Sequence, residues 1–247
     1  MSTIASRIGI AAVCVLSLGV PTFGVLTNGG FESGMTGWTS QYTQDGSNSG
    51  YSNQLYTTSA YHFSGQNSLY GYAYVVGDSS YWAEDDWSRT YAWSAPQDLR
   101  QLIHIQLYLA GFSSNTTHFS WGYGQEVWLV LSDGTHSAQA LLIDNHEPDF
   151  GSLVDRGLYS TAVGNDGRTW YRYQVEPTTT YFGGISSVDL SNARVGVMWE
   201  ALSWHSSPQT LWAGAYVDDI SLKMIPEPLT AVGFLLGGTL LALRRRT

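Results

Sequence analysis

Apolar and polar residues alternate along several short segments of this chain, and that alternation restricts the fold more than any other feature. In the segment 101–111, one face of an extended strand is entirely apolar: Ile103, Ile105, Leu107 and Leu109. A period of two is typical of a half-buried β-strand, whereas an amphipathic helix needs a period of about 3.6. Strands are also predicted within the segments 126–144, 169–177, 193–202 and 213–224.

The turns support the same fold class. Asp133-Gly134 separates two apolar runs and predicts a β-hairpin. The 27 glycines and the low charged fraction of 13% are typical of turn-rich β structure. Many short strands of this kind favour an antiparallel sandwich or barrel. We expect one all-β domain over residues 25–224, in which the polar segment 40–59 is a loop or an irregular edge.

The N-terminal segment 1–24 has the features of a signal peptide. Arg7 precedes an apolar stretch, and Thr22 and Gly24 supply the small residues of a cleavage site after Gly24. The alternative is a buried N-terminal helix, but the stretch has no polar face. Cys14, the only cysteine, lies in this leader. The exported domain would therefore have no disulfide and would depend on packing.

The C-terminal segment 225–247 has the features of a short membrane stop. Its uncharged run, 229–243, is about 15 residues long, or roughly 22 Å as a helix. A comfortable membrane span needs ~20 residues, so this run is short. Arginines follow the run and favour a cytoplasmic C-terminus. Such a segment suits a transient tether in the inner membrane better than a permanent transmembrane helix.

This tail resembles the PEP-CTERM sorting signal of certain Gram-negative bacteria. Three parts carry the resemblance: the motif Pro226, Glu227 and Pro228, the hydrophobic run, and the cluster Arg244, Arg245 and Arg246. The resemblance implies processing by an exosortase, after signal peptidase has removed the leader, and delivery to the cell envelope or extracellular matrix. An ordinary short tail anchor is the alternative.

The charge of the body excludes one class of partner. Between Val25 and Met224 there are 7 basic and 19 acidic residues, a net charge near −12. Nucleic acid is a poor partner for such a surface, because phosphate binding depends on clustered Lys and Arg. Neutral glycans, calcium and basic partners remain possible.

Three pieces of the body resemble jelly-roll carbohydrate-binding modules with a galactose-binding-like fold. They are the opening Asn28–Glu32, with Gly37-Trp38 shortly after it, the segment 61–72, and the last strand 216–224. The resemblance implies an antiparallel jelly-roll β-sandwich whose first and last strands lie side by side. It indicates the fold far more than a particular sugar.

The resemblance also implies a structural calcium ion held by Glu32 and Asp218, with Asp219 as the alternative ligand. Carboxylates that approach one another without a cation repel, or one of them keeps its proton. Main-chain carbonyls near 64–67 would complete the six to eight oxygen ligands of calcium. The alternative is that Glu32 caps backbone amides and that the aspartates face solvent.

Two aromatic clusters are candidate sugar sites, because exposed rings stack on sugar faces and acids bond hydroxyls. The first surrounds Glu84, Asp85 and Asp86 and comprises Tyr81, Trp82, Trp87, Tyr91 and Trp93. The second precedes the last strand and comprises Trp199, Trp204, His205 and Trp212. The alternative is that these rings belong to the core.

Acidic residues after residue 143 raise the question of a hydrolase. Asp144, His146, Glu147 and Asp149 lie close together, and paired carboxylates can serve as acid and base. No HExxH, Gly-x-Ser-x-Gly or phosphate-loop motif accompanies them. We therefore predict a non-catalytic envelope or matrix protein, structural or adhesive through extracellular polysaccharide. The alternatives are a dedicated carbohydrate-binding module and a glycoside hydrolase that uses Glu84, Asp86 or Glu147.

Overall fold

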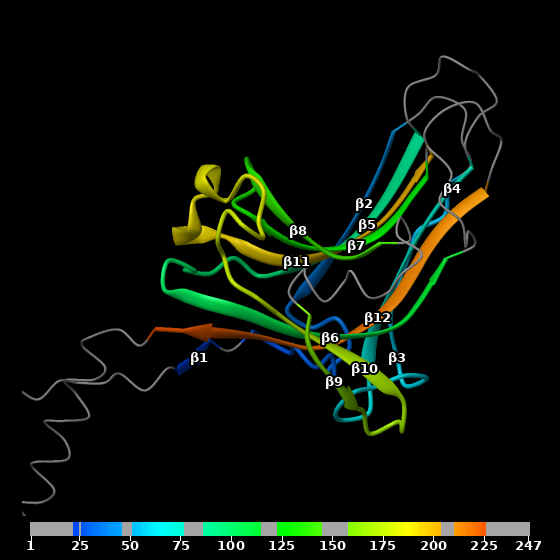
Figure 1. Cartoon of the computed structure of the whole chain (residues 1–247), viewed down its shortest axis with the longest axis horizontal. Coiled ribbons are helices and arrows are strands. Elements are labelled where there is room, and N and C mark those ends of the chain that lie inside the picture. Colours follow the sequence, from blue (N-terminus) through cyan, green and yellow to red (C-terminus); the bar gives the residue numbers. More distant parts are fainter. Residues whose placement is uncertain are drawn as a thin grey trace, which may run out of the picture. The chain divides into compact units, whose positions relative to one another are not determined.

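Two antiparallel sheets, packed face to face, form the body of the protein in the computed structural model (Figure 1). The structure describes residues 22–24, 26–45, 51–76, 86–114, 123–144, 158–203 and 210–225. Residues Thr22–Met224 pack as one unit. The remainder of the predicted signal peptide and the predicted sorting signal from Pro226 onward lie outside the described residues. Among the residues that are described, no helix is long and apolar enough to span a membrane.

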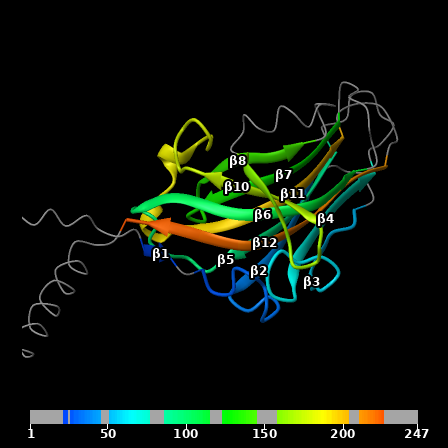
Figure 2. The same ribbon diagram turned by 60° about the horizontal axis from the view of Figure 1, so that its bottom comes forward.

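The seven-stranded sheet contains both ends of the described unit. Its strands are β1 (Thr22–Gly24), β3 (Gln54–Thr58), β4 (Ser68–Val76), β6 (Leu102–Ser114), β9 (Leu158–Val163), β10 (Thr169–Val175) and β12 (Thr210–Met224). Their order is β3-β4-β12-β6-β10-β9, and β1 also pairs with β12. Figure 2 shows β6 and β12 side by side in the middle of this sheet. The last strand thus lies beside β1, which precedes the predicted domain 25–224, whereas β2, the first strand within that domain, belongs to the other sheet.

The five-stranded sheet has the order β2-β5-β11-β7-β8. Its strands are β2 (Trp38–Asp45), β5 (Asp86–Ser94), β7 (Tyr123–Ser132), β8 (Ser137–Asp144) and β11 (Arg194–Ser203). Two short 3-10 turns, η2 (Ile185–Ser187) and η3 (Leu190–Asn192), precede β11. The chain crosses repeatedly from one sheet to the other, and every strand pair is antiparallel. The predicted jelly-roll β-sandwich is confirmed.

The alternation of the sequence decides which side chains enter the core. On β6 the predicted apolar face is buried at Ile105, Leu107 and Leu109, each 0% exposed. Burying one such side chain contributes about 1.5–3 kcal/mol. The hairpin predicted at Asp133-Gly134 joins β7 to β8, and Gly134 has the positive φ of 92° that its turn requires.

The core also contains Trp199, so its prediction as a candidate sugar-site residue is wrong. Trp199 is 0% exposed, and its indole nitrogen donates to the carbonyl oxygen of Ala215, 3.2 Å away in the facing sheet. A side chain at Gly71 would come within 2.2 Å of the indole ring. The ring therefore fills the space between the sheets.

Two predictions about boundaries have specific outcomes. The segment 40–59, predicted as a loop or an irregular edge, contains part of β2 and all of β3, which are edge strands of the two sheets with regular pairing. Strand β1 coincides with the last three residues of the predicted signal peptide and pairs with Leu222–Met224. Cleavage after Gly24 would remove this strand.

Candidate functional site

The outer face of the five-stranded sheet gathers charged and aromatic side chains. On β7 the residues Val127, Leu129 and Leu131 point into the core. Glu126 and Trp128, which alternate with them, therefore point outward. Figure 1 shows β7 and β8 bowed toward the seven-stranded sheet, which places this outer face on the inside of their curve. The concave side of a curved sheet is a common place for a ligand.

Cross-strand pairing arranges these side chains in rows. Residues that are directly opposite in an antiparallel sheet share a face and are in contact range. The polar row crosses all five strands: Thr43, Arg89, Glu200, Glu126 and Asp144. The aromatic row, two residues further along, is Gln41, Tyr91, Met198, Trp128 and Leu141. On the opposite side of the polar row, Trp87 pairs with Leu202.

A largely buried ion pair occupies the middle of the polar row. The Nε and Nη2 atoms of Arg89 both lie 2.5 Å from Oε1 of Glu200. The Glu200 side chain is 6% exposed and that of Arg89 is 29% exposed. The Arg89 guanidinium lies 4.2 Å above the ring of Trp87, in a cation–π contact. These contacts fix both the donor and the acceptor in position.

Glu126 lies beside this ion pair and is partly protonated at neutral pH. Burial raises its pKa to about 7, and the charge of neighbouring Glu200 acts in the same direction. The indole nitrogen of Trp128 donates to Oε2 of Glu126 at 2.9 Å. The polar row thus contains a carboxyl that can donate a hydrogen bond.

A pocket of about 270 Å³ lies at one end of this face, beside the β7–β8 hairpin. It is lined by Gln41, Tyr91, Trp93, Val130, Ser132, Gly134, Thr135, His136, Ser137, Gln139 and Arg194. The rings of Tyr91 and Trp93 are stacked, with centroids 5.4 Å apart. A Cβ atom on Gly196 would lie 2.4 Å from the Trp93 ring, so only glycine leaves room for this ring on the sheet.

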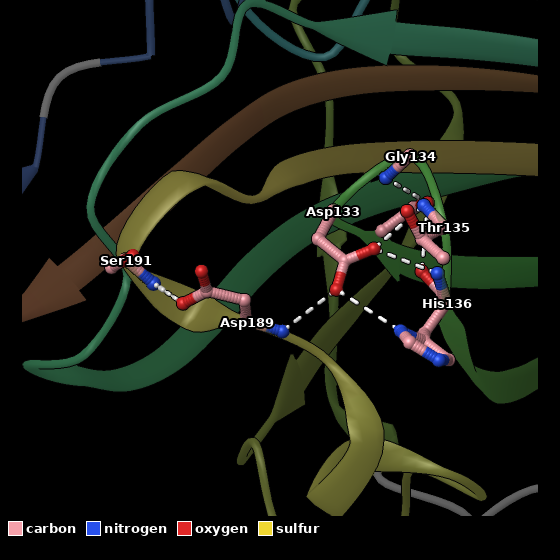
Figure 3. A network of polar contacts seen from close by, with 7 residues as sticks. Asp133, Gly134, Thr135, His136, Asp189 and Ser191 are labelled. Carbon is pink, nitrogen blue, oxygen red and sulfur yellow. Dashed lines mark hydrogen bonds and ion pairs between the residues drawn. The ribbon is translucent and has the colours of Figure 1, made fainter.

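The hairpin turn beside the pocket is held by one carboxylate (Figure 3). Oδ1 of Asp133 accepts from the backbone N–H groups of Thr135 and His136, both at 2.7 Å. Oδ2 accepts from the N–H of Asp189 at 2.9 Å and lies 3.5 Å from Nδ1 of His136. The backbone hydrogen bonds, from Asp189 above all, hold the pKa of Asp133 far below its usual range. The turn is thereby tied to the segment before η3.

The predicted sugar-site residues do not form one cluster. Trp87 and Trp93 lie on the outer face of the five-stranded sheet, and Trp93 is only 7% exposed. Trp212 belongs to the other sheet, where its ring centroid is 5.9 Å from that of Tyr72. The hydrolase candidate Asp86 is buried in β5. The following candidates lie outside the described residues: Tyr81, Trp82, Glu84, Asp85, His146, Glu147, Asp149, Trp204 and His205.

The outer face of the seven-stranded sheet carries a tyrosine row. Tyr56, Tyr70 and Tyr216 are directly opposite one another on β3, β4 and β12. Their ring centroids are 5.3 and 4.7 Å apart, and Tyr61 stacks on Tyr216 at 4.0 Å. Burial, followed by the neighbouring hydroxyls, raises the pKa of Tyr70 to about 12. The rings of the row contact one another, and Tyr56 at its edge is 45% exposed.

The predicted calcium ligands lie where β12 meets the N-terminal turn. Gly29 is packed so closely that a Cβ atom would lie 2.1 Å from the carbonyl oxygen of Ile220, and the Ile220 N–H donates to the Gly29 carbonyl. Burial, followed by the charge of Asp219, raises the pKa of Asp218 to about 7. Burial also raises the pKa of Asp219, and the charge of Glu32 adds to that shift. The three carboxyls therefore interact electrostatically.

Backbone amides, however, already bind these carboxylates. Oδ2 of Asp218 accepts from the N–H groups of Phe63 and Ser64, at 2.8 and 3.1 Å. Oε1 of Glu32 accepts from the N–H groups of Gln66 and Asn67, at 2.9 and 3.0 Å. The segment that was expected to offer carbonyls thus donates N–H groups instead. Within the described ranges no three His, Cys, Asp or Glu side chains are placed to hold a metal ion.

The carboxyl oxygens have the hard-donor chemistry that calcium prefers, but their arrangement matches the alternative in which Glu32 caps backbone amides. Calcium binding therefore stays a prediction.

Sequence reasoning missed the residues at the centre of the outer face: Arg89, Glu126 and Glu200. A signal was present, because "EVWLVL" and "VMWEAL" each place a glutamate next to or near tryptophan, in phase with the face opposite the apolar residues. An acidic residue inside an apolar strand is costly unless it has a partner, and this occurs twice. The pairing partners themselves depend on strand order, which the alternation does not contain.

No family model matches the sequence, and no curated protein matches it. Several solved structures are similar. One is a carbohydrate-binding module of the β-sandwich superfamily, with 11% identity and a TM-score of 0.38; the match covers 79% of this chain and 61% of that one. Another is a family 11 carbohydrate-binding module from Clostridium thermocellum in complex with a mixed-linked tetrasaccharide, with 12% identity, a TM-score of 0.35, and coverage of 75% and 88%.

A third is a carbohydrate-binding module that recognises mannan, with 11% identity and a TM-score of 0.35; the match covers 83% of this chain and 98% of that chain. The ligand of a protein this dissimilar does not transfer to this chain, so its function is argued from its own residues.

Proposed function

We propose that this protein binds a polysaccharide chain across the outer face of the five-stranded sheet. The observation that carries the proposal is the polar row with an aromatic residue on each side. Arg89 and Glu200 supply a fixed donor and acceptor between Trp87 and Tyr91. Sugars need this combination, because their ring faces are apolar and their edges carry hydroxyl groups.

The rigidity of the row supports binding by a preformed site. The Arg89–Glu200 pair and the Trp128–Glu126 hydrogen bond hold these polar groups before a ligand arrives. A preformed site loses less side-chain entropy on binding than a mobile one does. The protonated carboxyl of Glu126 adds a donor that a sugar oxygen can accept from.

The same geometry favours binding over hydrolysis. A retaining glycosidase keeps its two carboxyl groups about 5 Å apart, and an inverting one keeps them further apart. Here Oε1 of Glu200 already accepts from two nitrogen atoms of Arg89, so this carboxylate is held in an ion pair rather than free to act as a nucleophile or base. Release of reducing sugar by the wild-type chain, and its loss in Glu126→Gln, would overturn the non-catalytic assignment.

The proposed setting is the cell envelope or extracellular matrix. The leader with Arg7, the motif Pro226–Pro228 and the cluster Arg244–Arg246 support export, a transient membrane tether and processing by an exosortase. Binding of matrix polysaccharide would then give the protein a structural or adhesive role. Intact-mass measurement on protein from the native host tests this, because a chain that still ends at Thr247 would refute processing of the tail.

The decisive experiment for the binding site compares one variant on each outer face. Trp128→Ala removes a ring from the five-stranded sheet, and Trp212→Ala removes one from the seven-stranded sheet. Binding to a panel of purified polysaccharides is measured by affinity electrophoresis and calorimetry. We expect saturable binding to one glycan class that Trp128→Ala weakens by at least roughly tenfold and Trp212→Ala leaves unchanged. Equal losses in both variants would reject the site.

A structural calcium ion at Glu32, Asp218 and Asp219 remains part of the proposal. Burial, followed by the charge of Asp219, raises the pKa of Asp218, and a calcium ion would compensate the negative charge of both carboxylates. Binding to the folded state alone would raise the melting temperature as calcium is added. A melting temperature that neither calcium nor a chelator changes, in the wild type and in Asp218→Asn, would remove calcium from the proposal.

A further inference from the structure

The pocket beside the β7–β8 hairpin has a chemistry unlike the rest of the outer face. The polar row contains three acidic side chains, from Asp144, Glu126 and Glu200. The pocket is lined instead by an arginine, two glutamines, three hydroxyl-bearing side chains and a histidine, above the rings of Tyr91 and Trp93. An acidic face that ends in a cationic pocket is suited to a ligand whose own charge changes along its length.

Arg194 is the residue that makes the pocket cationic. It is the first residue of β11, it is exposed, and it shares the outer face with Gly196 and Met198. Ser132 pairs with it across the sheet, and Ser137 pairs with Ser132. Within the part of the chain that the structure describes, no carboxylate forms an ion pair with Arg194. Its guanidinium group is therefore available to an anionic ligand.

Gln41 supplies a neutral donor to the pocket beside Arg194. The indole nitrogen of Trp93 donates to Oε1 of Gln41 at 2.9 Å. That bond uses the acceptor of the Gln41 side chain and leaves its N–H groups as donors at the pocket wall. A Cβ atom added to Gly134 would meet nothing within 4 Å, so this wall is open to a ligand.

The one carboxylate in the adjoining turn does not compete for an anion. Asp133 is bonded to three backbone N–H groups and to the ring of His136 (Figure 3). Its charge is thus satisfied within the turn, which it holds rigid. The ring of His136 is 55% exposed and stays at the pocket side of the same turn.

We infer that this pocket binds a sugar unit that carries a carboxylate, that is, a uronic acid residue of the bound polysaccharide. Arg194 would hold the carboxylate in a bidentate contact, with Gln41 beside it. The planar fork of arginine matches a carboxylate in shape. Because the body carries a net charge near −12, a single acidic unit fits better than a densely charged chain.

The inference rests on the proposed function and defines its ligand further. Six residues separate Arg194 from Glu200 along β11, which is about 20 Å of extended strand. One sugar unit cannot span that distance, so the polar row and the pocket would hold different units of one chain. The glycan class indicated is a mostly neutral polysaccharide with sparse uronic acid units.

The test uses the full chain and three pairs of monosaccharides that differ in one group. Sodium glucuronate, galacturonate and mannuronate are compared with glucose, galactose and mannose at constant ionic strength, by NMR titration. We expect at least one uronate to bind roughly tenfold more tightly than its hexose, because hydrogen bonds to charged groups contribute more than neutral ones. Arg194→Gln should abolish this preference and Arg194→Lys should keep part of it.

Lys223→Gln is the matched control, since it removes one positive charge from the other sheet. It should leave the preference unchanged, and thermal unfolding should show that all three variants are folded. Equal affinity for each uronate and its hexose, or a preference that survives in Arg194→Gln, would overturn the pocket inference alone.

Polysaccharide binding that depends on Trp128 would still support the proposed function in that event. The opposite combination of results would separate the pocket inference from the proposed function as well. A uronate preference that Arg194→Gln removes, together with no polysaccharide binding by the wild type, would keep the pocket and reject the proposed function.

Discussion

Both outer faces of the sandwich carry aromatic residues, but the surroundings of these rings differ between the two faces. On the seven-stranded sheet, Tyr56, Tyr70 and Tyr216 pack ring against ring across three strands. On the five-stranded sheet, a charged row with Arg89 and Glu200 separates Trp87 from the aromatic row. Rings that cover one another stabilise a sheet, whereas rings separated by fixed polar groups offer surface to a ligand.

Aromatic content alone therefore does not locate a sugar site. Both faces are aromatic in the sequence, and each supplied a candidate, Trp87 on one and Trp212 on the other. The buried polar groups distinguish the faces, because such groups are costly and persist only with partners. The following predictions separate the two faces, beginning with the largest expected effect.

Breaking the central ion pair should destabilise the protein far more than a polar change on the other face. Glu200→Ala leaves the partly buried guanidinium of Arg89 without its carboxylate and should lower the free energy of unfolding by about 4 kcal/mol. Gln106→Ala removes the amide oxygen that Arg172 contacts on the seven-stranded sheet and should cost less than about 1 kcal/mol. Urea unfolding measures both, and equal costs would contradict the contrast.

The polar row and the tyrosine row should also titrate in different pH ranges. The carboxyl of Glu126 has its ordinary pKa of 4.5 when unfolded and about 7 when folded. Between these values the folded state holds more protons than the unfolded state, so the free energy of unfolding falls as the pH rises. Asp218, with a pKa raised from 3.8 to about 7, contributes with the same sign. On the tyrosine row, Tyr70 would lower stability only as the pH rises from 10.0 to about 12.

Urea unfolding at about pH 5 and about pH 8 should therefore differ by roughly 2 kcal/mol through Glu126 alone. Glu126→Gln should reduce the pH dependence by that amount, since the amide resembles the protonated carboxyl. Tyr70→Phe serves as the control and should leave the dependence over this range unchanged. A dependence that Glu126→Gln does not reduce would mean that the carboxyl is ionised in the folded protein at neutral pH.

Ring removal should affect binding on one face only. Tyr91→Ala takes away the ring that lies between the polar row and Trp93, and we expect glycan affinity to fall about tenfold. Tyr72→Ala is the matched change on β4 and should leave affinity unchanged. Calorimetry with the polysaccharide that binds best measures both. Weaker binding in Tyr72→Ala would point to a ligand on the tyrosine row.

The sequence predicted the fold in much more detail than the site. Alternation identified β6, the β7–β8 hairpin, β10, β11 and β12, because burial of one face imposes a period of two. These features depend on local order along the chain, which a single sequence contains.

The site depends on strand order, which a single sequence does not contain. Arg89 and Glu200 are 111 residues apart, and they meet only because β5 and β11 are neighbours. The same limitation placed Trp199 and Trp212 in one candidate cluster. Trp199 points into the core from one sheet, whereas Trp212 lies on the outside of the other. Alternation gives the face of each residue but not its neighbour across the sheet.

The smallest effect is expected at the exposed end of the tyrosine row. Tyr56 lies on edge strand β3, is 45% exposed, and contacts Tyr70 with ring centroids 5.3 Å apart. Tyr56→Ala should lower the free energy of unfolding by about 0.5–1 kcal/mol, the usual contribution of a cross-strand aromatic pair. A double-mutant cycle with Tyr70→Ala isolates that contribution from the loss of buried area. A coupling energy near zero, with unchanged glycan affinity, would mean that this row neither stabilises the sheet through ring contacts nor binds the glycan.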